Sequence, residues 1–207
     1  MVVIKKRTVK IFSVIIALVA LYLLYHWVWG ASYPDIFTPK PVLGNPDANV
    51  KIIEFSDLQC PACKVAHPVV QQIKEEFGNN ISFQYYHFPL RAIHPYAQKA
   101  AEAVECANDQ GKFWEYLDAA FSTSPELQNR NLKKLAEAVG LDVEKFSACL
   151  DSSAKWKVVD GEYRFGAAKD VLGTPTFFIN GKKIDDWNYE SLRAVIEREL
   201  RYRESKK

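Results

Sequence analysis

Two cysteines separated by two residues, Cys60 and Cys63, carry the clearest chemical signal in the sequence. Pro61 follows the first of them and suits the first turn of a helix, where its missing N–H would have no partner. A cysteine at a helix N-terminus faces unpaired backbone N–H groups and the positive end of the helix dipole, which favour the thiolate. The spacing therefore predicts Cys60 as an exposed nucleophile and Cys63 as a more buried thiol that resolves mixed disulfides.

Two other interpretations of this cysteine pair are possible. His67 lies one helical turn beyond Cys63, so a zinc site with two cysteines and one histidine is conceivable, as is a passive structural disulfide. The other two cysteines, Cys106 and Cys149, are far apart and form no second compact ligand pair. The sequence therefore favours redox chemistry and predicts neither a metal nor another cofactor.

Glu54 precedes the cysteine pair in a strongly apolar segment. It shares its parity with Val50 and Ile52, so a strand would turn all three side chains toward the same apolar face. A buried carboxylate is costly unless it has a role, and here it could relay a proton from Cys63. Burial would then raise its pKa. The alternative is a solvated glutamate at the edge of the sheet.

The elements that must position these residues follow from the sequence pattern. Residues 50–56 are β-branched and aromatic and predict a buried strand. Residues 61–77 predict a helix kinked at Pro68, with apolar residues at every fourth position from Val65. Residues 81–88 predict a second strand, and the strand–helix–strand order implies parallel pairing with a right-handed crossover.

The rest of the chain is mostly helical. Residues 94–170 are rich in Ala, Glu, Lys and Leu, with breaks that indicate four or five helices. Short strands at 176–179 and 182–184 join through a tight Asn-Gly turn, and a last helix covers about 188–203. The pattern predicts an α/β domain with a helical insertion.

The N-terminus indicates export. Residues 1–10 are basic, and residues 11–29 are uncharged, end in aromatic residues and are long enough to cross a bilayer. We predict a single-pass cell-membrane anchor with a cytoplasmic N-terminus, a proline-rich spacer at 30–48 and an extracytoplasmic domain at 49–207. A cleaved signal peptide is the alternative. With a net charge of +2, the chain has no electrostatic footprint for nucleic acid.

Export also bears on the remaining cysteines and histidines. Thiols of exported domains are normally paired, so we predict a structural disulfide between Cys106 and Cys149 rather than two free buried cysteines. His67, His87 and His94 have no partner set typical of a catalytic base, and we interpret them as structural or surface residues.

Several motifs in order resemble a known family. EFSDLQCPAC at 54–63, Pro68 and GTPTFFING at 173–181, separated by the helical block, look like the DsbA-like thioredoxin-fold oxidoreductases, especially their membrane-anchored bacterial and archaeal members. The resemblance covers about residues 41–200. It implies a thioredoxin-like fold with an inserted helical block, Cys60 as the nucleophile, Cys63 as the resolving thiol and Glu54 as the buried acid.

The resemblance also gives a role to Thr174 and Pro175. The residues alone leave open whether the bond between them is cis. By the resemblance, Pro175 is a cis-proline whose loop lies against the active site, and Thr174 offers a backbone edge to an extended peptide. Ala62 departs from the best-known oxidants, which carry His at this position of the motif.

We therefore expect a thiol–disulfide oxidoreductase that introduces disulfides into unfolded or reduced exported proteins. The resemblance implies reoxidation by a quinone-linked membrane partner of the DsbB or VKOR type. A reductase or isomerase with the same fold is the alternative, distinguished by redox potential. From another class, a non-catalytic peptide-binding or chaperone module would lack a redox-active Cys60.

Overall fold

The computed structural model describes residues 15–16, 18–22 and 40–204. The chain divides into two compact units, Met1–Ile36 and Phe37–Lys207. In the first unit, the described residues are helical and exposed. None of the helices in the described ranges is long and apolar enough to cross a membrane. Most of the expected anchor lies outside the described residues.

The second unit is built around one mixed β-sheet. Its strand order is β1-β3-β2-β4-β5, with β2 and β3 parallel and the other neighbours antiparallel. The strands are β1 (Val42–Gly44), β2 (Val50–Ser56), β3 (Ile81–His87), β4 (Thr176–Ile179) and β5 (Lys182–Ile184). The parallel pair and the terminal hairpin confirm the sequence prediction.

Strand β1 corrects the expected spacer at 30–48. Val42–Gly44 pairs with β3, and Lys40 just before it is only 8% exposed, so this part of the chain belongs to the folded domain. Prolines at 41 and 46 suggested an unpaired segment. An edge strand tolerates flanking prolines because only one of its sides must form hydrogen bonds.

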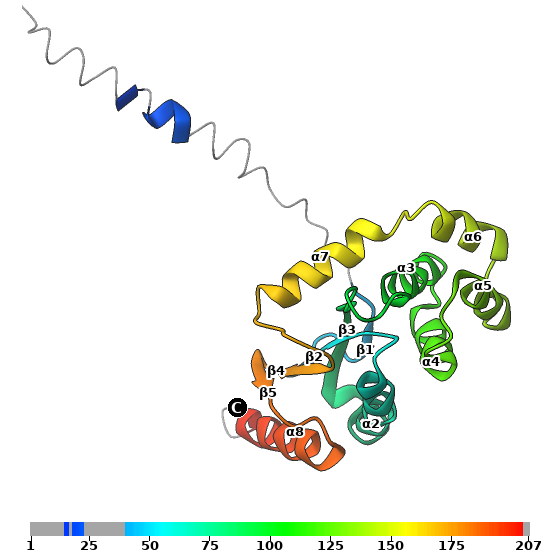
Figure 1. The fold of residues 1–207 in the computed structure, drawn as a ribbon. Helices are drawn as coiled ribbons and strands as arrows, with labels where there is room; N and C mark the ends of the chain where they lie inside the picture. Colours follow the sequence, from blue (N-terminus) through cyan, green and yellow to red (C-terminus); the bar gives the residue numbers. More distant parts are fainter. Residues whose placement is uncertain (1–14, 17, 23–39, 205–207) are drawn as a thin grey trace, which may run out of the picture. The chain divides into compact units, whose positions relative to one another are not determined.

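Helices make up most of the rest of the described part of this unit (Figure 1). Five helices lie between β3 and β4, as the composition of 94–170 predicted. The helices are α2 (Pro61–Phe77), η1 (Gly78–Asn80), α3 (Ala97–Asn108), α4 (Phe113–Thr123), α5 (Asn129–Ala138), α6 (Val143–Asp151), α7 (Trp156–Ala167) and α8 (Tyr189–Glu204).

Helix α2 buries a stripe that only partly matches the one expected. Ile73 is buried as expected, but Val65 is 64% exposed. Cys63, Ala66 and Val70 are buried in its place. Steps of four residues drift around a helix of 3.6 residues per turn, and the alternating steps of three and four keep one face toward the core. The correction places Cys63 at the start of the core-facing stripe.

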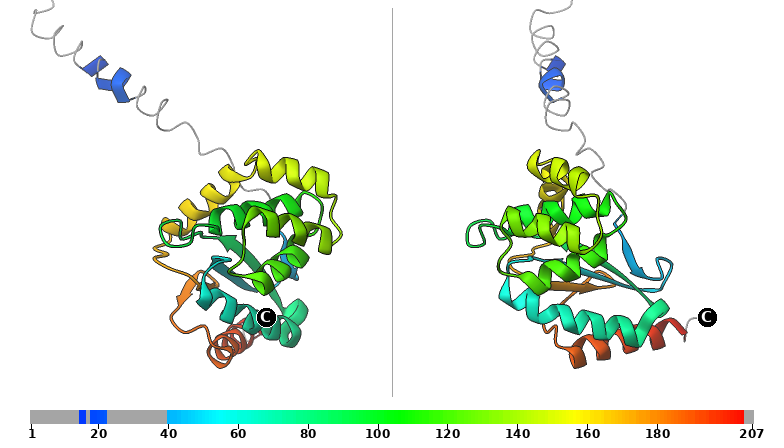
Figure 2. Two further views of the ribbon diagram at one scale, coloured as in Figure 1. Left: turned by 45° about the vertical axis from the view of Figure 1, so that its right-hand side comes forward. Right: turned by 90° about the vertical axis from the view of Figure 1, so that its right-hand side faces the viewer.

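The two faces of the sheet are covered by different helices. The face with Ile52 and Tyr85 packs on α2 and α8, which lie side by side in Figures 1 and 2, and on the helical insertion. The opposite face, with Phe55 and Tyr86, is covered by α7, whose Phe165 ring lies 5.7 Å from that of Phe55. Alternation along β2 sends Glu54 to the α2 face, beneath the cysteine pair.

The predicted disulfide is present. Cys106 of α3 and Cys149 of α6 are bonded, with their Cα atoms 5.9 Å apart. The bond ties together two helices of the insertion through cysteines that are 43 residues apart in sequence.

Replacing both cysteines of this bond by alanine should lower the free energy of unfolding by up to about 4 kcal/mol, because the open loop gains conformational entropy in the unfolded chain. Urea unfolding in a Cys60→Ser/Cys63→Ser background measures this without interference from the redox pair. Equal midpoints with and without the bond would contradict a stabilising role.

Candidate active site

The cysteine pair lies at the beginning of α2, directly after β2. Cys60 is the N-cap residue, with φ −71° and ψ 123°, and Pro61 occupies the first helical position. The Cys60 N–H donates to the Asp57 carbonyl at 3.0 Å, which closes the turn between strand and helix. No acidic residue lies in the first turn of α2, so nothing there opposes a negative charge on Cys60.

Cys60 is less accessible than the sequence suggested. It is 7% exposed, against 0% for Cys63, so the order of burial is as predicted but the nucleophile is not openly exposed. Its Sγ lies 3.5 Å from the Thr174 carbonyl oxygen and donates to it when protonated. The loop before β4 therefore covers the nucleophile.

The two thiols have opposite acidities. A hydrogen bond from the Cys63 thiol, helped by the backbone N–H groups of Cys63 and Ala62, lowers the pKa of Cys60 to about 5 against the opposing effect of burial. Burial raises the pKa of Cys63 strongly, and its hydrogen bond to Cys60 raises it more. Cys60 is therefore a thiolate at neutral pH, and Cys63 keeps its proton.

The Thr174–Pro175 peptide bond is cis, as the resemblance implied. The Thr176 hydroxyl donates to the Gly173 carbonyl at 2.8 Å and holds the loop. Oγ1 of Thr174 is buried and finds no hydrogen-bond partner in the described part of the chain. A second cis bond, Ser124–Pro125, had no signal in the sequence analysis.

Glu54 is 2% exposed, which rules out the solvated alternative. Burial raises its pKa to about 7, although Ser56 and His67 act in the opposite direction. Its charge in turn raises the pKa of Cys63. A carboxyl group that titrates near neutrality beside a very weakly acidic thiol is a candidate proton acceptor for that thiol.

Glu54→Gln should slow the attack of Cys63 on a mixed disulfide by about 10²-fold, the usual contribution of a general base. The dependence of this step on a group with a pKa of about 7 should disappear. Stopped-flow release of a peptide from Cys60 measures the step, with the exposed Glu115→Gln as control. Because Gln also removes a charge that makes Cys63 less acidic, faster release would contradict the assignment.

Comparisons with known proteins agree with this geometry. Residues 38–198 match the family model described as Thioredoxin. The chain belongs to the thioredoxin family. It is 40% identical over 157 residues to a Na(+)/H(+) antiporter NhaA 1 of Salinispora arenicola, covering 75% of this chain and 24% of that protein. The chain thus spans about a quarter of the length of the first curated relatives it matches.

Solved structures place the chain within this family. BdbD from Bacillus subtilis is 26% identical, with a TM-score of 0.72, and the match covers 78% of this chain and 93% of that one. DsbA from Chlamydia trachomatis has a TM-score of 0.71 at 20% identity, over 80% of this chain and 93% of that one. The chain has the fold of the DsbA-like thiol–disulfide oxidoreductases, and the Cys60–Cys63 pair is present in it.

This thioredoxin-family site contains one pair that the sequence analysis missed. The carboxylate of Asp57, directly after β2, lies 2.8 Å from Nδ1 of His94, beyond the end of β3. The sequence analysis interpreted His94 as a structural or surface residue and did not foresee this acidic partner. Only the place of Asp57 between a buried strand and the cysteine pair could have signalled it.

His67 is engaged by two residues of α4. Its Nε2 lies 2.9 Å from Asp118 Oδ1, and its ring stacks on Phe121 at 4.5 Å. The imidazole is therefore engaged on the α4 side of α2. This arrangement does not support the zinc alternative with Cys60 and Cys63.

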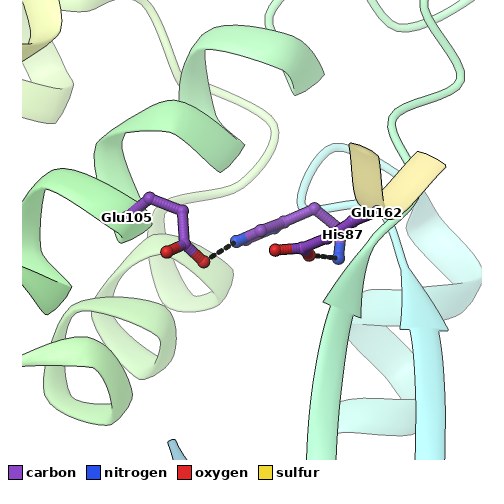
Figure 3. A group of neighbouring side chains, drawn as sticks. All are labelled: His87, Glu105 and Glu162. Carbon is purple, nitrogen blue, oxygen red and sulfur yellow. Dashed lines mark hydrogen bonds and ion pairs between the residues drawn. The ribbon is translucent and has the colours of Figure 1, made fainter. Parts of the chain in front are cut away.

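A second cluster of ionisable residues lies at the end of β3. Figure 3 shows Glu105 beside the His87 ring and Glu162 beside its backbone N–H, at 3.3 and 2.7 Å respectively. Among the described residues, this is the group of metal-binding side chains whose ligand atoms lie close enough together to hold an ion. The ammonium group of Lys40 contacts both carboxylates, so the chain supplies its own cation there.

The charges in this cluster are strongly linked. Burial alone would lower the pKa of Lys40, but Glu162 and Glu105 more than offset this and raise it. Burial likewise favours the neutral form of Glu105, yet His87 and Lys40 together lower its pKa. Sequence analysis missed Lys40 because it lay in the expected spacer.

Proposed function

We propose that the protein introduces disulfide bonds into exported proteins through Cys60 and Cys63. A substrate thiolate attacks Sγ of Cys60 in the oxidised pair, the disulfide breaks, and Cys63 leaves and takes up a proton. A second substrate thiolate then attacks the substrate sulfur of the mixed disulfide and releases Cys60 as a thiolate. Two electrons pass from the substrate dithiol to the cysteine pair.

The acidity of Cys60 carries this proposal. A thiolate with a pKa of about 5 is a good leaving group, and its stability favours the reduced pair over the disulfide. A pair that is easily reduced transfers its disulfide to substrates. This observation favours oxidation over reduction of the substrate.

Further residues of the site have proposed roles. Glu54 accepts a proton when Cys63 attacks a mixed disulfide from inside, and supplies one when Cys63 leaves. Thr174 and Pro175 bind the backbone of an extended substrate beside Cys60, which is supported by the 3.5 Å approach of the Thr174 carbonyl to the nucleophile. Pro61 and Ala62 complete the CPAC active-site motif.

The proposal includes a place and a partner. The uncharged segment 11–29 with its basic flank supports a membrane anchor, with the domain outside the cytoplasm. A quinone-linked membrane protein of the DsbB or VKOR type would then reoxidise the pair. The presence of both cysteines supports catalysis over a passive binding module.

Anaerobic incubation of the oxidised protein with a reduced, unfolded protein tests this function. We expect close to one substrate disulfide per protein molecule, with both thiols of the cysteine pair released. Cys60→Ser should form none. A reduced form of the protein that instead removes disulfides from an oxidised substrate, without the reverse reaction, would identify a reductase.

A further inference from the structure

Asp57 connects the loop that carries Cys60 to the loop that follows β3. Its carboxylate is fully buried. Oδ1 accepts from the Gln59 N–H at 2.7 Å, within the cysteine loop. Oδ2 accepts from the Leu90 N–H and from Nδ1 of His94, both at 2.8 Å, in the other loop.

The backbone of Asp57 also contacts both cysteines. Its carbonyl accepts from the Cys60 N–H at 3.0 Å, and its N–H lies 3.4 Å from Sγ of Cys63. A displacement of Asp57 would therefore move the reacting sulfurs. The side chain and backbone of one residue link the redox pair to the loop after β3.

That loop forms one wall of a surface pocket. The pocket is lined by Pro89, Leu90, Arg91, Ala92, Ile93 and Tyr163. Ile93 is 69% exposed. On its far side the loop is held to α7, because the Arg91 guanidinium stacks on Tyr163 at 4.8 Å and pairs with Asp160 at 3.1 Å. The hydrogen bonds to Asp57 hold the side of the loop that faces the cysteine loop.

We propose that Asp57 and His94 are positioning residues that fix this pocket loop relative to Cys60, so that a peptide lying in the pocket presents its sulfur to the nucleophile. The inference rests on the proposed function, because it assigns the pocket to the peptide substrate. Small errors in the alignment of reacting atoms have large effects on rate, so a loop held to Asp57 by two charge-assisted hydrogen bonds would matter for catalysis. A small thiol can react with Cys60 without filling the pocket, so we expect its rate not to depend on this alignment.

The geometry of the contact between Asp57 and His94 indicates which substitution of His94 should preserve the function. A carboxylate only accepts hydrogen bonds, so Nδ1 of His94 carries the proton in this pair. Asparagine places an amide N–H close to the position of Nδ1 and can donate to Asp57. Glutamine places its amide one bond farther out, near Nε2, and cannot make the same contact without moving the loop.

The test compares His94→Ala, His94→Asn and His94→Gln with wild type in the full chain. The rate constant for attack on the oxidised Cys60–Cys63 pair is measured with a cysteine-containing peptide and with dithiothreitol. In His94→Ala and His94→Gln we expect the rate constant to fall about tenfold or more with the peptide, and less than about twofold with dithiothreitol. His94→Asn should recover most of the peptide rate. Melting temperatures are recorded for each variant.

Two results would overturn the inference. Equal losses with peptide and dithiothreitol would show a general effect on the redox pair, and unchanged peptide rates beside a lowered melting temperature would show a purely structural contact. If His94→Ala does not fold, the ratio of the peptide rate constants of His94→Asn and His94→Gln decides between the two outcomes. Failure of the proposed function would look different. The wild-type protein itself would then release the peptide without having introduced a disulfide into it.

Discussion

Cys63→Ser should accumulate covalent complexes with substrate proteins, joined through Cys60, whereas Cys60→Ser should accumulate almost none. In the single variant Cys60 still reacts as a thiolate, with a pKa lowered by the helix N-terminus even after the hydrogen bond from Cys63 is lost. No internal thiol remains to release the complex, so it persists until an outside thiol arrives.

Non-reducing electrophoresis followed by mass spectrometry of the complexes measures this trapping. Starting the variant as a mixed disulfide with a small thiol allows a substrate thiol to enter at Cys60. Cys60→Ser is the matched control, because it retains one cysteine of the pair. Stable complexes through Cys63, or faster alkylation of Cys63 than of Cys60 at pH 6, would reverse the assignment of the two cysteines.

Lys40→Met should cost about 3–5 kcal/mol of unfolding free energy, the usual result of removing one partner from a buried ion pair. The methionine fills a similar volume but leaves the carboxylates of Glu105 and Glu162 without the ammonium group that contacts both. The matched control is Lys112→Met, whose 3.4 Å pair with Glu115 is exposed and should contribute about 1 kcal/mol or less.

The cost of Lys40→Met should also depend on pH. Burial raises the pKa of Glu162 even beside Lys40, and without the ammonium group this pKa rises further. A carboxyl group whose pKa is raised on folding destabilises the fold at pH values above its unfolded pKa. The variant should therefore lose more stability at pH 7 than at pH 5. Urea unfolding at both pH values measures this, and equal losses would show that the carboxylates do not depend on Lys40.

Those parts of the site that depend on local rules and on topology could be predicted from the sequence. Cys60 before Pro61 marks a helix N-terminus, and the parity of Glu54 with Val50 places it on the buried face of β2. The pairing of Cys106 with Cys149 followed from the expectation of export and from the absence of other cysteines in the helical block. Each of these inferences needs only the immediate neighbours of a residue or the number of cysteines.

Contacts between distant segments could not be predicted in the same way. Lys40 reaches Glu105 across 65 residues, and Asp57 reaches His94 across 37, with no periodicity to relate them. The low exposure of Cys60 depends on a loop 114 residues later in the chain. Such contacts are determined by tertiary packing, and only the family resemblance had brought the Thr174 loop to the active site.

The acidity of Cys60 links the oxidation state to stability. Its pKa of about 5 in the folded reduced protein lies below the ordinary value of 9.0. A lowered pKa stabilises the folded state fully above the unfolded value, and this contribution declines as pH falls and is lost below the folded value. Near pH 7 the reduced form should therefore be more stable to urea than the disulfide form, and the difference should shrink toward pH 5.

The redox potential of the Cys60–Cys63 pair, measured by equilibration with glutathione buffers at pH 7, tests the central claim most directly. The stabilised thiolate favours an oxidant, while Ala62 supplies no positive charge to stabilise it further, so we expect a potential of roughly −200 to −120 mV. A potential near −270 mV, together with an oxidised form that is the more stable of the two, would make the protein a reductase and contradict the proposed oxidase.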